Sequence, residues 1–157
     1  MVITMGLMSK LNKIQLELKA PKNKTNNFGG YKYRDLSGIL EALKPLLQKY
    51  ELGLTMTDEI ISVQDRIYLQ ATATLYDTNE NETLSVRGLA REPISLKGQS
   101  DPQLTGSCSS YARKYALNGL FCIDDSQDID SMDHTKQEAP KRTRRSRIVK
   151  QDETCPF

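Results

Sequence analysis

The 157-residue sequence contains no tryptophan, few aromatic residues and a single histidine, His134. A mechanism that depends on histidine side chains is therefore disfavoured. Nothing in the sequence resembles a nucleophile elbow or a catalytic dyad. The phosphate-binding pattern G-x-x-x-x-G-K-[ST] is also missing, which disfavours an ATP motor of the RecA type. These absences predict a protein that is not an enzyme, with no catalytic residues and no cofactor.

Cysteine is also scarce, and long apolar runs are missing. The three cysteines, Cys108, Cys122 and Cys155, are an odd number without a C-x-x-C pair, so they predict neither a disulfide framework nor a metal site. No apolar run approaches the ~20 residues that a membrane span needs. The opening residues lack the features of a signal peptide, and Met5 and Met8 are alternative starts. We therefore expect a reduced, cytosolic protein without a membrane partner.

Positive charge is present mainly at the C-terminal end. Residues 1–130 hold 15 Lys and Arg against 16 Asp and Glu, whereas residues 131–157 hold 7 against 4. Residues 141–150 contain six of these cations, and such a run is typical of a disordered segment that binds nucleic acid electrostatically or only aids solubility. We therefore divide the chain into a body, residues 1–130, and a flexible basic tail, residues 131–157.

Helical periodicity dominates the first third of the sequence. It predicts a short first helix, a loop over residues 20–30, and a second helix over residues 36–50 that Asp35 or Ser37 caps. Pro45 lies within the second helix and is expected to kink or break it, because proline has no backbone donor. The apolar residues that line the first helix are Leu7, Leu11, Ile14 and Leu18.

The period then changes from helical to alternating. Alternation indicates one strand from residue 52 onward, a second over residues 67–75 and a third over residues 84–90. Turn-forming residues at 64–65 and 77–81 separate these strands, so antiparallel hairpins are expected. Together with the flanking helices, the three strands predict an α+β fold in the order helix, three-stranded antiparallel meander, helix.

A final helix begins near Ser100, where Ser100-x-x-Gln103 matches a capping box. Asn118-Gly119 predicts its end, because glycine accepts the left-handed conformation of a helix cap. The small residues of this helix allow close approach of backbones; they are Gly106, Ser107, Ser109, Ser110, Ala112 and Ala116. The residues that recur at helical spacing and are expected on one face are Leu104, Cys108, Tyr111, Tyr115 and Gly119.

This last helix also carries the strongest family signal. Residues 106–123, GSCSSYARKYALNGLFCI, precede an acidic run, and residues 31–34 and 39–46 add a second patterned region. Together these segments resemble the ERF (essential recombination function) family, phage and prophage proteins that anneal complementary single strands of DNA. The resemblance implies a fold like that of ring-forming annealing proteins, a homo-oligomeric ring, and ATP-independent binding and annealing of single-stranded DNA in recombination and repair. The resemblance also implies a location in the cytoplasm of a bacterial host cell and a phage exonuclease as a further candidate partner.

The candidate DNA-binding side chains combine tyrosines with cations. In residues 31–34 tyrosines alternate with cations; tyrosine can stack on a base for ~1–3 kcal/mol, while the cations hold phosphates. Arg87 and Arg91 alternate on the exposed face of the third strand, with Lys97 just after it. Two alternatives stay open: the tyrosines pack on the core, and the arginines only solvate the sheet. The candidate residues are Tyr31, Lys32, Tyr33, Arg34, Arg87, Arg91, Lys97, Tyr111, Arg113 and Lys114.

An acidic cluster follows the last helix and suggests a different function. Clustered carboxylates hold magnesium in nucleases. A calcium-binding loop is a separate possibility, and the spacing of these residues does not fit it. We expect no metal site. We interpret the cluster as an acidic segment where the chain leaves the packed core. A metal-dependent nuclease is the second hypothesis and a protein-interaction module the third. The four carboxylates are those of Asp124, Asp125, Asp128 and Asp130.

The last six residues form a second short pattern. They resemble the acidic tip of bacterial single-stranded-DNA-binding proteins, which ends in proline and phenylalanine. That resemblance implies a peptide ligand for host DNA-repair proteins at a free chain end. Cys155 and the single Asp-Glu pair depart from the fuller acidic pattern, so a chance match is an equal alternative. The residues of the tip are Asp152, Glu153, Pro156 and Phe157.

Overall fold

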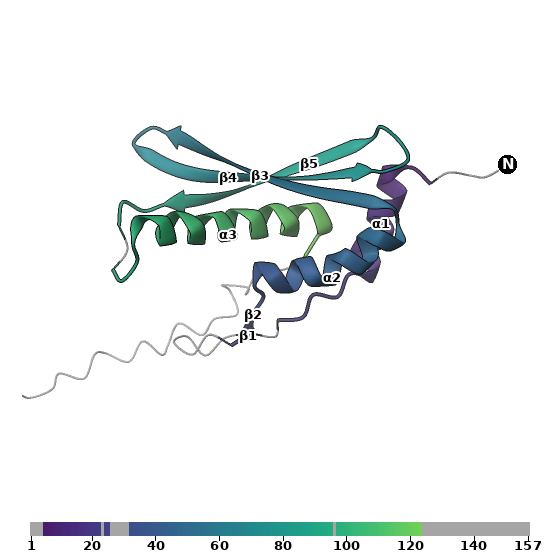
Figure 1. Ribbon diagram of the computed structural model, residues 1–157, viewed down its shortest axis with the longest axis horizontal. Helices are drawn as coiled ribbons and strands as arrows, with labels where there is room; N and C mark the ends of the chain where they lie inside the picture. The colour runs from purple at the N-terminus through teal and green to yellow at the C-terminus, as the bar shows by residue number, and fades with distance from the viewer. Residues whose placement is uncertain (1–4, 23, 26–31, 96, 124–157) are drawn as a thin grey trace, which may run out of the picture. The chain divides into compact units, whose positions relative to one another are not determined.

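The computed structural model describes residues 5–22, 24–25, 32–95 and 97–123, which all belong to one compact unit. Figure 1 shows α3 lying along one face of the sheet β3-β4-β5, with α1 and α2 at the end of the sheet where α3 ends. The predicted α+β fold and its order of helix, meander and helix are confirmed. The elements are α1 (Leu7–Glu17), β1 (Lys24–Thr25), β2 (Lys32–Tyr33), α2 (Leu36–Lys49), β3 (Leu52–Val63), β4 (Arg66–Asp77), β5 (Thr83–Glu92) and α3 (Asp101–Phe121).

The three long strands form an antiparallel meander in the order β3-β4-β5. Strands β3 and β4 pair along their whole length, from Leu52 opposite Asp77 to Val63 opposite Arg66. The two residues between them make the tight turn that the sequence predicts, and Gln64 adopts the left-handed conformation there with φ 54°. Strand β5 pairs with β4 in the same antiparallel sense, from Tyr76 opposite Thr83 to Ile67 opposite Glu92.

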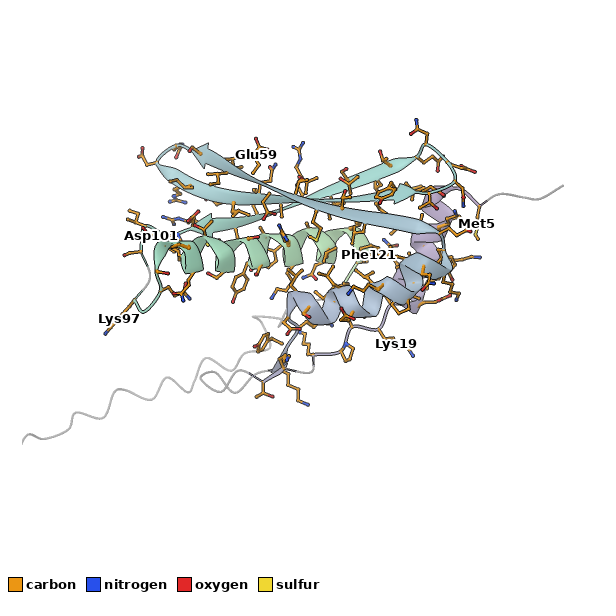
Figure 2. The ribbon with its side chains drawn as sticks, in the orientation of Figure 1. Met5, Lys19, Glu59, Lys97, Asp101 and Phe121 are labelled. Atoms are coloured by element: carbon orange, nitrogen blue, oxygen red, sulfur yellow. The ribbon has the colours of Figure 1, made fainter. Side chains whose placement is uncertain are left out.

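Side chains alternate between the two faces of this sheet, as the period of two requires. Strand β4 buries Leu69, Ala71, Ala73 and Leu75 toward α3, while the residues between them are half-buried on the opposite side. We call this opposite side the outer face; no element of the described ranges covers it. Glu59 lies on the outer face in Figure 2, on the side of the sheet away from α3.

Helix α3 approaches β5 very closely at Gly88. A Cβ atom at this position would lie 2.3 Å from the backbone oxygen of Ala112 and 2.4 Å from the backbone nitrogen of Ala116. Both alanines are fully buried. Glycine on the strand and alanine on the helix are therefore what the short distance between the two backbones requires.

Because α3 lies so close to the sheet, its buried face differs from the predicted one. Leu104 and Cys108 are buried as expected, but Tyr111 and Tyr115 are 53% and 46% exposed. The placement of these tyrosines on the same face as Leu104 was wrong, since a large ring does not fit between the two backbones. The buried residues of α3 are Leu104, Cys108, Ala112, Ala116, Leu117, Leu120 and Phe121.

The ends of α3 test two further predictions. At its start, the side chain of Gln103 accepts a hydrogen bond from the backbone N–H of Ser100 at 3.0 Å, as in the predicted capping box. The predicted end at residues 118–119 was wrong, because the helix continues to Phe121. Leu120 and Phe121 are almost fully buried, so their packing outweighs the glycine signal, and Cys122 supplies the left-handed cap with φ 53°.

The N-terminal helices pack around the same core. Leu7, Leu11 and Ile14 of α1 are buried as predicted. Asp35 caps α2 by accepting a hydrogen bond from the backbone N–H of Gly38 at 2.9 Å. We expected a kink or a break at Pro45; because Pro45 lies inside α2 without ending it, the break was wrong, and the kink stays a prediction. The reason is burial: apolar residues on both sides of the proline pack against one core, namely Ile39, Leu43, Leu46 and Leu47.

Two further contacts fix the N-terminal region. Residues 20–30, expected as a loop, include strand β1, which pairs with β2 through Lys24 opposite Tyr33. The ammonium group of Lys10 in α1 forms a buried ion pair with Asp77 at the end of β4, at 2.7 Å. The hydrogen bond from Lys10 lowers the pKa of Asp77, because it stabilises the charged carboxylate.

Among the helices of the described residues, none is long and apolar enough to cross a membrane.

Candidate nucleic-acid interface

A pocket of about 180 Å³ lies between the start of α2 and the middle of α3. One wall comes from residues 33–36, where β2 leads into α2, and the other from α3. We call this pocket the groove. It brings two segments together that are far apart in the sequence and that both carry the family pattern. The residues that line it are Tyr33, Arg34, Asp35, Leu36, Ser110, Tyr111 and Lys114.

The α3 wall exists because the buried stripe of that helix consists of alanines. Tyr111 and Lys114 are three residues apart, so they lie on one flank of the helix beside this stripe. The ammonium group of Lys114 lies 5.0 Å from the centre of the Tyr111 ring, a cation–π contact. The ring of Tyr115 lies 6.2 Å from that of Tyr111, tilted by 44°. The helix therefore presents an aromatic surface with a cation directly beside it.

The opposite wall combines an aromatic ring, a cation and a carboxylate. Tyr33 on β2 is 37% exposed. The guanidinium group of Arg34 donates a hydrogen bond to the backbone oxygen of Ala20, which fixes the side chain beside the N-terminal loop. The carboxylate of Asp35 caps α2 and lies 3.7 Å from the ammonium group of Lys24. These contacts thus hold the cation of Arg34 and the carboxylate of Asp35 in defined positions beside Tyr33.

This arrangement has the chemistry of a single-strand nucleic-acid site. Exposed tyrosines offer flat surfaces on which bases stack, and neighbouring cations attract phosphates. Four of the candidate DNA-binding residues line the groove: Tyr33, Arg34, Tyr111 and Lys114. Lys32, exposed on β2, lies next to this wall in the sequence. Their role in binding DNA stays a prediction, and the structure adds that they form one site.

Arg113 lies next to Lys114 in the sequence but contacts a different element. Its guanidinium group donates hydrogen bonds to both carboxylate oxygens of Asp58 on β3, at 3.0 and 2.9 Å. The hydroxyl of Ser109 donates to the same carboxylate at 2.6 Å. Although burial raises the pKa of Asp58, the hydrogen bonds from Arg113 and Ser109 hold it below its ordinary value. Arg113 therefore joins α3 to β3 and is not among the residues that line the groove. Its role in DNA binding stays a prediction.

Arg87 and Arg91 belong to a second surface. Both are exposed on the outer face, as the alternation of β5 predicts. The register places Thr72 of β4 opposite Arg87 and Tyr68 opposite Arg91. Lys97 does not join them, because Figure 2 shows it in the loop before α3, away from the outer face. The candidate residues from the sequence are thus divided between the groove, the outer face and a loop.

Sequence reasoning did not find two contributors to these sites. Asp58 was not recognised as the partner of Arg113, although alternation places it on the apolar side of β3 between Met56 and Ile60. A carboxylate in such a row needs a partner, and this signal was available in the sequence. Leu36, which adds an apolar surface to the groove, was not predicted as a site residue.

Several predicted features lie outside the described residues. They are Tyr31, the acidic cluster of Asp124, Asp125, Asp128 and Asp130, the basic tail over residues 131–157, and the tip with Asp152, Glu153, Pro156 and Phe157. Within the part of the chain that the structure describes, no group of three or more His, Cys, Asp or Glu side chains could hold a metal ion. The nuclease hypothesis concerns residues beyond that part and stays untested.

Comparison with known proteins supplies independent information on the family. The model of the ERF superfamily matches residues 7–154. Over 140 residues the chain is 47% identical to the "Essential recombination function protein" of Salmonella phage P22. This match covers 88% of the chain but 66% of the phage protein, so the chain spans just under two thirds of the length of this relative. No solved structure matches the chain.

Proposed function

Because the chain belongs to the ERF superfamily, we propose that it acts in DNA recombination by binding single-stranded DNA and annealing complementary strands without ATP. The name of the phage P22 relative supports the recombination role, and the chemistry of the groove supports the single-stranded ligand. The proposed partner is therefore single-stranded DNA of any sequence, since the groove offers stacking surfaces and cations but no base-reading motif.

The observation that carries this proposal is the meeting of the two patterned segments in one pocket. Tyr33 and Arg34 come from the first segment, and Tyr111 and Lys114 come from the second. Packing of the core does not require this, because the buried face of α3 consists of other residues and both tyrosines remain partly exposed. A shared ligand explains why exposed aromatic and cationic side chains face one space.

The chemistry of annealing needs no covalent step. Cations around the groove, Lys32, Arg34 and Lys114, neutralise phosphates and so reduce repulsion between two strands. Stacking of bases on tyrosine competes with hairpins in the bound strand, which leaves neighbouring bases free to pair. Arg87 and Arg91 on the outer face are a second candidate surface for a DNA backbone.

We also propose that the protein is a homo-oligomer, a ring by family resemblance. The sheet supports this, because β3 and β5 are edge strands within the described residues and unpaired edges favour pairing with another chain. The small residues of α3 do not support it, since Ala112 and Ala116 are buried within the chain. A phage exonuclease, and host repair proteins that bind the C-terminal tip, are further proposed partners.

The test is annealing of complementary oligonucleotides by the full-length protein in EDTA without any nucleotide. We expect faster pairing than without protein, no cleavage when magnesium is added, and light scattering from an assembly larger than a monomer. Lys114→Gln is expected to slow annealing and to reduce the slope of log K against log[salt] by about 0.7, the effect of one lost phosphate contact.

Lys44→Gln is the matched control for Lys114→Gln. It removes the same charge from an exposed position on α2 whose pair with Glu41 is a surface ion pair, so annealing and the salt slope should not change. Magnesium-dependent cleavage that disappears in Asp124→Ala or Asp125→Ala would replace annealing with the nuclease hypothesis. Absence of both annealing and single-strand binding would contradict the proposed function.

A further inference from the structure

We propose that the groove holds one unstacked nucleobase, while the phosphates of the same strand lie outside it on the surrounding cations. This inference rests on the proposed binding of single-stranded DNA and specifies what enters the site. According to this proposal the base and the backbone of the strand are bound at different places: the base in the pocket and the backbone at its rim.

The size of the groove supports a single ring system. Its volume is about 180 Å³, whereas pockets for drug-sized ligands measure about 300–1,000 Å³. Several stacked nucleotides do not fit in such a space. One base does, with the sugar and phosphates left at the opening.

The walls of the groove support an aromatic occupant. Tyr33 comes from β2, Tyr111 comes from α3, and Leu36 adds an apolar side chain between α2 and the ligand space. Both rings are accessible, since Tyr33 is 37% and Tyr111 53% exposed. The two rings come from different elements and line one pocket, and both remain partly exposed to solvent.

Charges of both signs line the groove, the cations of Arg34 and Lys114 and the carboxylate of Asp35, so the groove is not a uniformly positive site for phosphate. Asp35 lines the pocket, and its carboxylate is held in place by the backbone N–H of Gly38. A carboxylate repels a phosphate placed beside it, whereas a neutral base meets no such repulsion. The ammonium group of Lys114 lies over the Tyr111 ring, 5.0 Å from its centre. A base that stacks on this face displaces the ammonium group, and the flexible lysine side chain then contacts the neighbouring phosphate.

A base pocket also gives a reason for preferring single strands. A base in a duplex can enter only after unpairing and unstacking, which costs a few kcal/mol, whereas a base in a single strand enters at much lower cost. Pairing of the held nucleotide with a complementary strand requires its base to leave the pocket. Annealing therefore weakens the contact with this site, and the duplex product is bound less tightly there than the substrate.

The experiment uses the full-length protein and oligothymidine with one central 2-aminopurine, whose emission reports stacking. We expect emission to change on binding to wild type, and this change to be largely lost in Tyr33→Ala and Tyr111→Ala. Each substitution should weaken single-strand affinity about tenfold, within the range for loss of one stacking ring. The corresponding phenylalanine variants should retain both signals, because they keep the ring. If one alanine variant fails to fold, the other carries the test.

Tyr68→Ala removes a ring from the outer face instead and should leave the change in 2-aminopurine emission as in wild type. Tight single-strand binding with no dependence on Tyr33 or Tyr111 would refute the base pocket and leave the proposed function intact. An effect of Tyr68→Ala equal to that of Tyr111→Ala would also refute it, by moving the contact to the outer face. Absence of binding by folded wild-type protein would instead contradict the proposed function itself.

Discussion

At the scale of single residues, the absence of a side chain at Gly88 determines how close α3 lies to the sheet. A Cβ atom added at Gly88 would meet backbone atoms of α3. These atoms cannot move aside as the end of a flexible side chain can. By contrast, a Cβ atom at Gly106 on the same helix would meet nothing within 4 Å. The two glycines therefore have different structural roles.

Gly88→Ala is expected to lower the free energy of unfolding by about 3 kcal/mol, the upper part of the range for overpacked cores. The added methyl group must push α3 away from β5, which also disturbs the contacts of Ala112 and Ala116. Gly106→Ala is the control and should raise stability by up to about 1 kcal/mol, since alanine is the better helix former. Urea denaturation measures both, and equal effects of the two substitutions would contradict the close contact at Gly88.

At the scale of elements, the sequence predicts most of the architecture and misses details that depend on tertiary distance. The stripe of α1, the cap of α2 at Asp35 and the turn before Arg66 all follow from local patterns, and the structure confirms them. The buried face of α3 does not follow, because spacing alone cannot show that the sheet lies too close for Tyr111. The end of α3 was missed for a related reason: burial of Phe121 is a property of the packed core.

The ion pair between Arg113 on α3 and Asp58 on β3 gives a prediction at this scale. Arg113→Gln should lower the free energy of unfolding at neutral pH by about 0.5–1 kcal/mol, a modest value because the pair is partly exposed. The pKa of Asp58 is lowered in the folded state from its ordinary value of 3.8. The pair therefore stabilises the fold above that pH, and this stabilisation is lost as the pH falls through the lowered pKa.

The measurement is the urea midpoint of wild type and Arg113→Gln at pH 7 and at acid pH. The difference between them should shrink on acidification, while the salt slope of single-strand binding stays as in wild type. Unchanged stability together with a smaller salt slope would give the opposite answer, namely that Arg113 contacts DNA rather than Asp58.

At the scale of the whole described region, candidate DNA-binding residues lie on two separate surfaces. Sequence patterns pointed to Tyr33, Arg34, Tyr111 and Lys114 one by one, but not to their common pocket, because that depends on how α2 and α3 are arranged in the fold. The same patterns grouped Lys97 with Arg91, which the loop before α3 separates in space. Of the two surfaces, the groove alone unites both segments of the family pattern.

Cross-linking of single-stranded DNA to the full-length protein tests the role of the groove most directly. Oligothymidine is bound, irradiated with ultraviolet light and digested, and the cross-linked peptides are identified by mass spectrometry. The account predicts cross-links at residues 32–36 and 110–114, on both walls of the groove, and their loss when unlabelled single strands compete. Cross-links confined to the outer face, at Tyr68 and around Arg87 and Arg91, would contradict it.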